Sequence, residues 1–511
     1  MSATEVSGRR SGRTAPERTD RGPSWATVLR TAASGGRGDR TRIALTATGA
    51  GAAALALLCA ATVAWMGPEH GPYTTAALNE PGLHAGVVAA LVLLCVPVLA
   101  FAGQCARVGA PARERRLAAL RLQGATPGDV VRVVAAETGV AALLGSVAGT
   151  GLFLVLRAVL DAPVRATWAL DRTVTYDNGS TGTVTEQFSG LARRLPTDVL
   201  PPWPALLAVV VAVPVSAALF AVLSMRRVAV TPFGVVRREQ QRPVRVLPVV
   251  LLAVGTAGTA GFTALLELLG LQDAAPQVSG LLFTALLLAT AVGLLLGTGA
   301  LAAAVGAALA ARVRRPALLL AGRRLVAAPT TAARTHAALL VVVLLAALNQ
   351  GVRADLLAVP DPASSYAQTL ALVDAGFVIA AVIAAAGLVV GAVEGVVSRR
   401  SVLAGMSATG VPRSTLHAAV LVETLLPLVA PVVLAATAGV LGARGILGTT
   451  ASTTVFDAAT GDAVLRTVEV AVPWSPLLVL VGAALGTSVL AVLAVLPLLQ
   501  RSVQPSELRA G

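Results

Sequence analysis

Apolar residues run along this chain in long stretches that are separated by short polar or arginine-rich segments. Each stretch is near the ~20 residues that a helix needs to cross a bilayer, so the pattern predicts membrane-spanning helices. Ten spans are expected, over residues 43–66, 85–104, 139–160, 204–224, 246–270, 280–303, 337–353, 374–397, 421–442 and 475–498. The predicted fold class is an all-α polytopic membrane protein.

Composition supports this prediction. Of the 511 residues, 56% are hydrophobic and only 13% are charged, and the mean hydropathy is +0.78. No soluble core could absorb so much apolar surface, which excludes a soluble globular protein. All 40 basic residues are arginine. The meaning of the net charge of +14 depends on the side of the membrane on which the arginines lie. No nucleic-acid partner is expected.

The arginines are distributed unevenly around the ten predicted spans. With the N-terminus inside, 32 arginines fall on the inner side and eight on the outer side. Since basic residues of short loops stay in the cytoplasm, both termini are predicted to be cytoplasmic. Residues 1–42 lack the cleavage site of a signal peptide and are interpreted as a cytosolic tail. The inner arginines also favour contact with anionic membrane lipids.

A charged segment between two spans occurs twice, in residues 113–137 and again in residues 399–423. An offset of 286 residues aligns five pairs: Arg113 with Arg399, Leu117 with Leu403, Leu120 with Met406, Gly124 with Gly410, and Glu137 with Glu423. The chain is therefore predicted to contain a duplication.

The first copy has the local features of two helices joined by a corner. Leu117 and Leu120 share one helical face, and Gly124 suits a left-handed C-terminal cap. Thr126 is a candidate N-cap, with Pro127 at the first helical position and an aspartate in the first turn. The second helix is expected to continue into the next span.

Two outer segments alternate between apolar and polar residues around turn sequences. Residues 173–188 read TVTYDNGSTGTVTEQF, and residues 453–472 have the same character with Gly461 and Asp462 in the turn. These patterns predict small extracellular β-hairpins. Each duplicated unit thus reads span, charged segment, span, hairpin, span.

The repeated charged segment resembles the cytosolic coupling element of FtsX-like ABC transporter permeases. That element has an Arg/Glu-rich start, an apolar stretch, a glycine corner and a glutamate at the mouth of the next helix. Copy two matches less closely, because it lacks the glutamate after its first arginine and its Pro412 comes one residue earlier. An ordinary basic loop between spans is the alternative interpretation of both segments.

The resemblance implies two FtsX-like repeats, over residues 85–240 and 374–511. The predicted organisation is a tail over 1–42, a first permease unit over 43–240, two linking transmembrane helices and a basic cytosolic segment over 241–336, and a second unit over 337–511. By this resemblance the chain is a multi-pass permease of the bacterial cell membrane. It would use a separate cytosolic ABC ATPase, in two copies, to drive export or extraction of a hydrophobic or amphipathic substrate.

The same resemblance implies which residues contact the ATPase. The coupling set is Arg113, Glu114, Arg116, Leu117, Leu120, Gly124, Arg399, Arg400, Leu403, Met406 and Gly410. Glu137 and Glu423 are candidate relay residues, with favourable electrostatics near a helix N-terminus as the alternative.

Enzymatic activity is not expected of this chain. Without lysine it has no P-loop, so ATP would be bound by the partner, and no cofactor is expected. Cys59, Cys95 and Cys105 lie in or beside apolar runs, and the four histidines are scattered, so no metal site is predicted.

Two other functions remain open from the sequence. The chain could pass ATPase motion to an extracellular hydrolase or sensor partner without moving a substrate. A secondary transporter is less favoured, because inverted repeats and charged sites at the membrane midplane are expected there.

Overall fold

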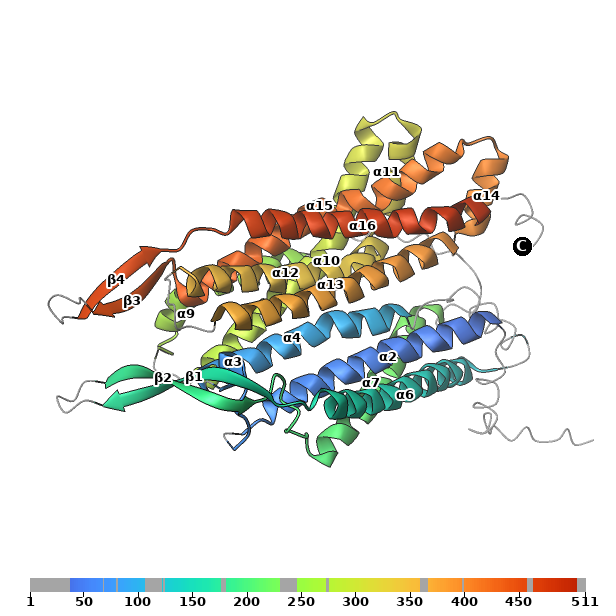
Figure 1. Cartoon of the computed structure of the whole chain (residues 1–511). Helices are drawn as coiled ribbons and strands as arrows, with labels where there is room; N and C mark the ends of the chain where they lie inside the picture. The colour runs from blue at the N-terminus through green and yellow to red at the C-terminus, as the bar shows by residue number, and fades with distance from the viewer. Residues whose placement is uncertain are drawn as a thin grey trace, which may run out of the picture.

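The computed structural model describes residues 37–67, 69–79, 81–105, 122, 125–175, 181–229, 246–272, 275–358, 366–397, 399–456 and 463–502. Over these residues the chain is a bundle of long helices with two separate two-stranded sheets (Figure 1). This confirms the predicted all-α fold class with small hairpins.

The first unit is built around one leading helix. Its elements in chain order are α2 (Arg37–Ala64), α3 (Ala76–Asn79), α4 (Pro81–Cys105), α6 (Pro127–Leu160), β1 (Val164–Thr175), β2 (Thr181–Ala192) and α7 (Trp203–Ala229). Helix α2 packs against α4, α6 and α7. It therefore holds the unit together.

Small residues bring α2 and α6 into close contact. Gly145 and Gly149 of α6 lie against the backbones of Ala47 and Gly51 of α2, so that a β-carbon on either α6 glycine would collide with backbone atoms. A glycine at every fourth position lets two membrane helices approach closely and gain van der Waals contact.

The second unit repeats the order of the long helices and strands of the first. Its elements are α12 (Pro329–Leu356), α13 (Tyr366–Val397), α14 (Arg400–Ala408), α15 (Arg413–Leu447), β3 (Thr450–Phe456), β4 (Ala463–Glu469) and α16 (Trp474–Ser502). The positions that correspond to α3 in the second unit and to most of α14 in the first lie outside the described residues. Leading helix α12 packs on α15 as α2 packs on α6. Residues 338–347 of α12 are all buried and form the centre of the largest apolar core.

The linking segment contains α8 (Val246–Ala260), α9 (Phe262–Leu268), α10 (Pro276–Arg312) and α11 (Pro316–Ala327). The sequence pattern predicted one span over 246–270, but the helix axis bends by 88° between α8 and α9. Gly261 lies at the break as the N-cap of α9. Glycine weakens a helix interior, and its position here allows the chain to turn.

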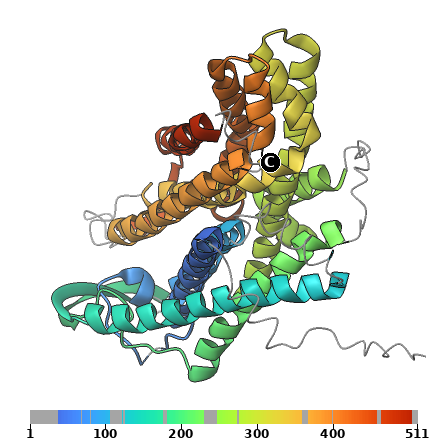
Figure 2. The ribbon, with the colours of Figure 1, turned by 90° about the vertical axis from the view of Figure 1, so that its right-hand side faces the viewer.

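Among the described residues, eight helices are long and apolar enough to cross a membrane, or nine if the bent pair counts as one span. Helix α4 covers the stretch expected to form the second span. The two units meet where α4 packs against α12 and α13. Figure 2 shows this arrangement from one end, with the blue helices of the first unit beside the orange helices of the second.

Both predicted hairpins are present. The first pairs β1 with β2, where Trp168 stacks on Phe188 across the strands with ring centroids 6.3 Å apart. The second pairs β3 with β4. Their expected turn residues lie outside the described residues. Both hairpins lie at one end of the bundle, whereas α14 lies at the other (Figure 1).

Candidate functional site

The second charged segment forms a short helix followed by a sharp corner. Helix α14 begins after Arg399 and ends in a left-handed cap, with Gly410 at φ +91°. The Gly410 amide donates to the Ser407 carbonyl and the Val411 amide to the Met406 carbonyl. These two hydrogen bonds satisfy carbonyl groups that would otherwise lack a partner at the end of the helix. Glycine adopts this backbone conformation without strain. The predicted corner is thus present at Gly410.

Leu403 holds α14 against the neighbouring helices. Its side chain is 1% exposed and packs with Leu416 of α15, Val396 of α13 and Val495 of α16. Met406 packs against the same cluster and is partly buried. The resemblance implied that Leu403 contacts a partner, but in this conformation Leu403 faces the chain's own interior.

The apolar side chain that α14 offers to its surroundings is Val402, which is 58% exposed. Successive residues of an α-helix point about 100° apart, so Val402 lies on a different face of α14 from its neighbour Leu403. The sequence pattern did not single out Val402. A partner that docks on α14 would contact this side chain.

Glu423 of α15 joins three helices through its carboxylate. One oxygen lies 2.7 Å from Arg399 Nη1, and the other lies 3.4 Å from Arg324 Nη1 of α11. Arg399 also donates from Nε to the Gly395 carbonyl at 2.8 Å. Burial lowers the pKa of Arg324, and the Glu423 charge opposes that shift. The triad ties the start of α14 to α15 and α11.

A small cavity of about 60 Å³ lies beside this triad. Apolar residues form most of its wall. The polar residues that line it are Arg324, Thr335, His336, Arg399, Glu423 and Thr424. Among the described residues, no group of histidine, cysteine or acidic side chains could hold a metal ion.

The first charged segment is only partly described. Arg113, Glu114, Arg116, Leu117, Leu120 and Gly124 lie outside the described residues, as does the side chain of Arg400. The helix that follows has the predicted cap. Thr126 Oγ1 accepts a hydrogen bond from the Asp129 amide, the Asp129 carboxylate accepts one from the Thr126 amide, and Pro127 is the first helical residue.

The two candidate relay residues occupy matching positions. Glu137 and Glu423 each lie ten residues after the first residue of their helices, α6 and α15. The Glu137 side chain is buried. Both glutamates thus lie more than two turns inside their helices, beyond the first turn where favourable N-terminal helix electrostatics are concentrated.

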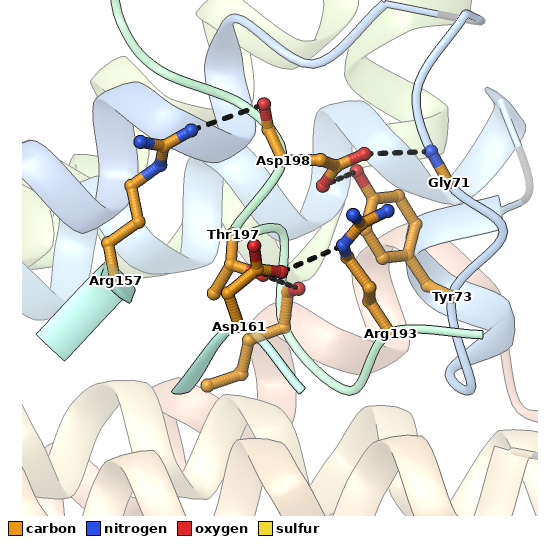
Figure 3. Close-up of polar contacts among 8 residues, drawn as sticks. Gly71, Tyr73, Arg157, Asp161, Arg193, Thr197 and Asp198 are labelled. Atoms are coloured by element: carbon orange, nitrogen blue, oxygen red, sulfur yellow. Dashed lines mark hydrogen bonds and ion pairs between the residues drawn. The ribbon is translucent and has the colours of Figure 1, made fainter. Parts of the chain in front are cut away.

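At the opposite end, a polar network fixes the base of the first hairpin (Figure 3). Asp198 accepts hydrogen bonds from the Gly71 amide at 3.0 Å and the Tyr73 hydroxyl at 2.9 Å. Burial and the Asp198 contact raise the pKa of Tyr73. The loop between α2 and α4 is thereby fastened to the segment between β2 and α7.

A second carboxylate strengthens the same network. Asp161, at the end of α6, accepts hydrogen bonds at 2.9 Å from Arg193 Nε and from Thr197 Oγ1 (Figure 3). These bonds lower the pKa of Asp161. Sequence reasoning missed this network. The available signal was linker length, since residues 193–202 separate β2 from α7 while only 470–473 separate β4 from α16.

One stretch of the chain matches a known protein family. Residues 86–233 match the family model described as FtsX-like permease C-terminal. This range runs from α4 to the segment just beyond α7 and agrees with the first repeat expected over 85–240. No curated protein and no solved structure gave a significant match.

Proposed function

Because residues 86–233 match the FtsX-like permease C-terminal family model, we propose that the chain is the membrane permease subunit of an ABC transporter. A separate cytosolic ATPase, bound in two copies, supplies the energy. The cargo is a hydrophobic or amphipathic molecule that is exported or extracted from the bacterial cell membrane. Both termini and both charged segments lie on the ATPase side.

The observation that carries this proposal is the continuity of α15. It starts three residues after Gly410 and ends at Leu447, three residues before β3. At 1.5 Å per residue its 35 residues span about 52 Å. Helix α6 joins the first charged segment to β1 in the same way with 34 residues. One continuous helix in each unit thus connects the charged segment with the hairpin.

The contacts at the α14 corner provide the transmission. Leu403 and Leu416 pack α14 onto α15, and the Arg399–Glu423 ion pair fixes its start. Displacement of α14 by a closing ATPase dimer therefore moves the end of α15. Val402 is the exposed contact on α14 in this scheme. In the first copy Leu117 and Leu120, which align with Leu403 and Met406, remain the candidates that the sequence pattern indicates.

Mechanotransmission to an extracellular partner is the second candidate. The first hairpin favours it, because Phe188 is exposed and Leu191 is 63% exposed on β2. Exposed apolar residues on an extended hairpin are suited to contact with another protein. Transport of a labelled lipid-like cargo by reconstituted permease and ATPase would distinguish the first function from the second.

The proposal is tested by purification of the tagged chain from its native membrane. We expect an ABC ATPase to co-purify in two copies per chain. Val402→Asp combined with Leu117→Asp and Leu120→Asp should abolish this association while the chain stays inserted. Leu191→Asp is the matched control, since its exposure is similar but it lies on the hairpin. Retention of the ATPase by the triple variant would contradict the proposal.

A further inference from the structure

A basic patch lies where α10 turns into α11. No aspartate or glutamate occurs between Asp273 and Asp355, although this stretch contains seven arginines. Four of them have exposed side chains: Arg312, Arg314 and Arg315 at the turn, and Arg323 about two helical turns further along α11. Within the part of the chain that the structure describes, none of these four forms an ion pair with an acidic side chain. We name these residues the basic turn.

The basic turn is held firmly by the helices that flank it. Gly306 of α10 and Gly322 of α11 lie so close that a β-carbon on Gly306 would lie 2.7 Å from the Gly322 carbonyl oxygen. Only residues 313–315 separate the two helices, and Pro316 begins α11. The arginines are therefore grouped by rigid backbone, which reduces the entropy lost when they bind a ligand together.

The position of the basic turn points to the bilayer. Figure 2 shows the yellow α10–α11 turn at the outer edge of the bundle, away from the first unit. In Figure 1 the same turn projects from the side of the bundle at the top of the view, nearer to α14 than to the hairpins. A group at the lateral edge of a membrane bundle faces lipid. A partner that docks on α14 would approach from the end of the bundle.

We propose that the basic turn binds the phosphate groups of anionic phospholipids at the inner membrane surface. Arginine suits this ligand because its planar guanidinium can donate two parallel hydrogen bonds to one phosphate. These four arginines, which form no ion pair with an acidic side chain among the described residues, create a positive patch along the turn and α11. Each is expected to strengthen binding roughly fivefold.

Helix α11 also connects this lipid contact to the candidate functional site. Arg323 is exposed, while the next residue, Arg324, points inward to Glu423, which holds Arg399 at the start of α14. Lipid bound at the basic turn therefore fixes the helix that supports the α14 corner. This consequence rests on the proposed function, whereas lipid binding itself does not.

Native mass spectrometry of the purified full-length chain tests the binding. The delipidated chain is titrated with phosphatidylglycerol or with phosphatidylcholine, and bound lipids are counted. We expect selective retention of phosphatidylglycerol. The variant R312Q/R314Q/R315Q/R323Q should bind it several hundredfold more weakly, since four contributions of roughly fivefold multiply. The variant R312K/R314K/R315K/R323K should retain most of the binding.

Matched controls separate this site from general charge effects. Arg413→Gln removes an exposed arginine near α14, and Arg194→Gln removes one beside the hairpin; both should leave lipid binding unchanged. Unchanged elution and thermal unfolding would show that the glutamine variant is folded. Equal phosphatidylglycerol binding by the folded glutamine variant and the wild type would overturn the proposal, as would equal loss in the Arg413→Gln control.

Discussion

The carboxylate of Glu423 on α15 lies 2.7 Å from the guanidinium of Arg399 at the start of α14, and the same carboxylate also contacts Arg324. Removing Glu423 leaves two arginines without this partner, whereas removing Arg399 leaves the Arg324–Glu423 pair intact. We therefore expect Glu423→Gln to destabilise the fold by roughly 1–3 kcal/mol. Arg399→Gln should have a smaller effect. Thermal unfolding of the purified variants measures the difference.

A double-mutant cycle provides the control for this triad. If the Arg399–Glu423 contact acts as a pair, the combined variant should be less destabilised than the two single effects added together. Additive effects would show that the ion pair does not couple α14 to α15. Arg413→Gln, at the exposed start of α15, should be close to neutral.

Neighbouring residues of α14 should respond differently to truncation. Leu403 is buried among α13, α15 and α16, so Leu403→Ala should lower the free energy of unfolding by about 2–5 kcal/mol through cavity formation. Val402 is exposed, so Val402→Ala should change it by less than about 0.5 kcal/mol. Chemical or thermal unfolding measures both changes in the free energy of unfolding. Equal changes for Leu403→Ala and Val402→Ala would contradict the assignment of a buried and an exposed face.

Features governed by short-range rules could be predicted from the sequence. The spans follow from the length of apolar stretches, and the hairpins follow from alternation around turn residues. The Thr126 cap with Asp129 and the left-handed Gly410 also depend on only a few adjacent residues. The repeat at an offset of 286 residues then gave the order of elements in both units.

Features that depend on tertiary packing could not be predicted in this way. Periodicity indicated that Leu403 belongs to an apolar helix face, but not whether that face meets a partner or the chain itself. Arg324 and Glu423 are 99 residues apart, and Tyr73 and Asp198 are 125 residues apart. No local pattern links such residues. The bend at Gly261 was concealed because the stretch remains apolar on both sides of it.

The close contact between α2 and α6 gives a prediction with an internal control. Gly149→Leu should force α2 and α6 apart, because a side chain there collides with the Gly51 backbone. Gly151→Leu, on the same helix, has open space around its β-carbon and should be tolerated. The unfolding temperature in detergent should fall clearly only for the Gly149 variant. Equal tolerance of both would contradict the packing described for α2.

The hairpin base should depend on pH through Asp161. Hydrogen bonds from Arg193 and Thr197 lower its pKa in the folded protein, so its contribution to stability is present above the ordinary carboxyl pKa of about 3.9. That contribution is lost as the pH falls through the lowered value. The stability difference between wild type and Asp161→Asn should therefore be constant above about pH 5 and vanish in stronger acid.

Thermal unfolding between about pH 2 and pH 7 measures this dependence. Thr197→Val is the matched control, since it removes one hydrogen bond to Asp161 but leaves the titrating group and Arg193 in place. It should keep part of the pH dependence that Asp161→Asn loses. An Asp161→Asn variant with the same pH profile as the wild type would contradict the role of this carboxylate.

The predicted orientation is tested by cysteine labelling in intact cells. Starting from a chain in which Cys59, Cys95 and Cys105 are replaced by alanine, single cysteines are introduced at exposed serines of the two hairpins, as Ser189→Cys and Ser452→Cys. Thr409→Cys places a third in the corner after α14. The arginine distribution predicts that a membrane-impermeant maleimide labels both hairpin cysteines and does not label Thr409→Cys until the cells are opened. Labelling of Thr409→Cys from outside, with protection of both hairpin positions, would invert the orientation and remove α14 from the reach of a cytosolic ATPase.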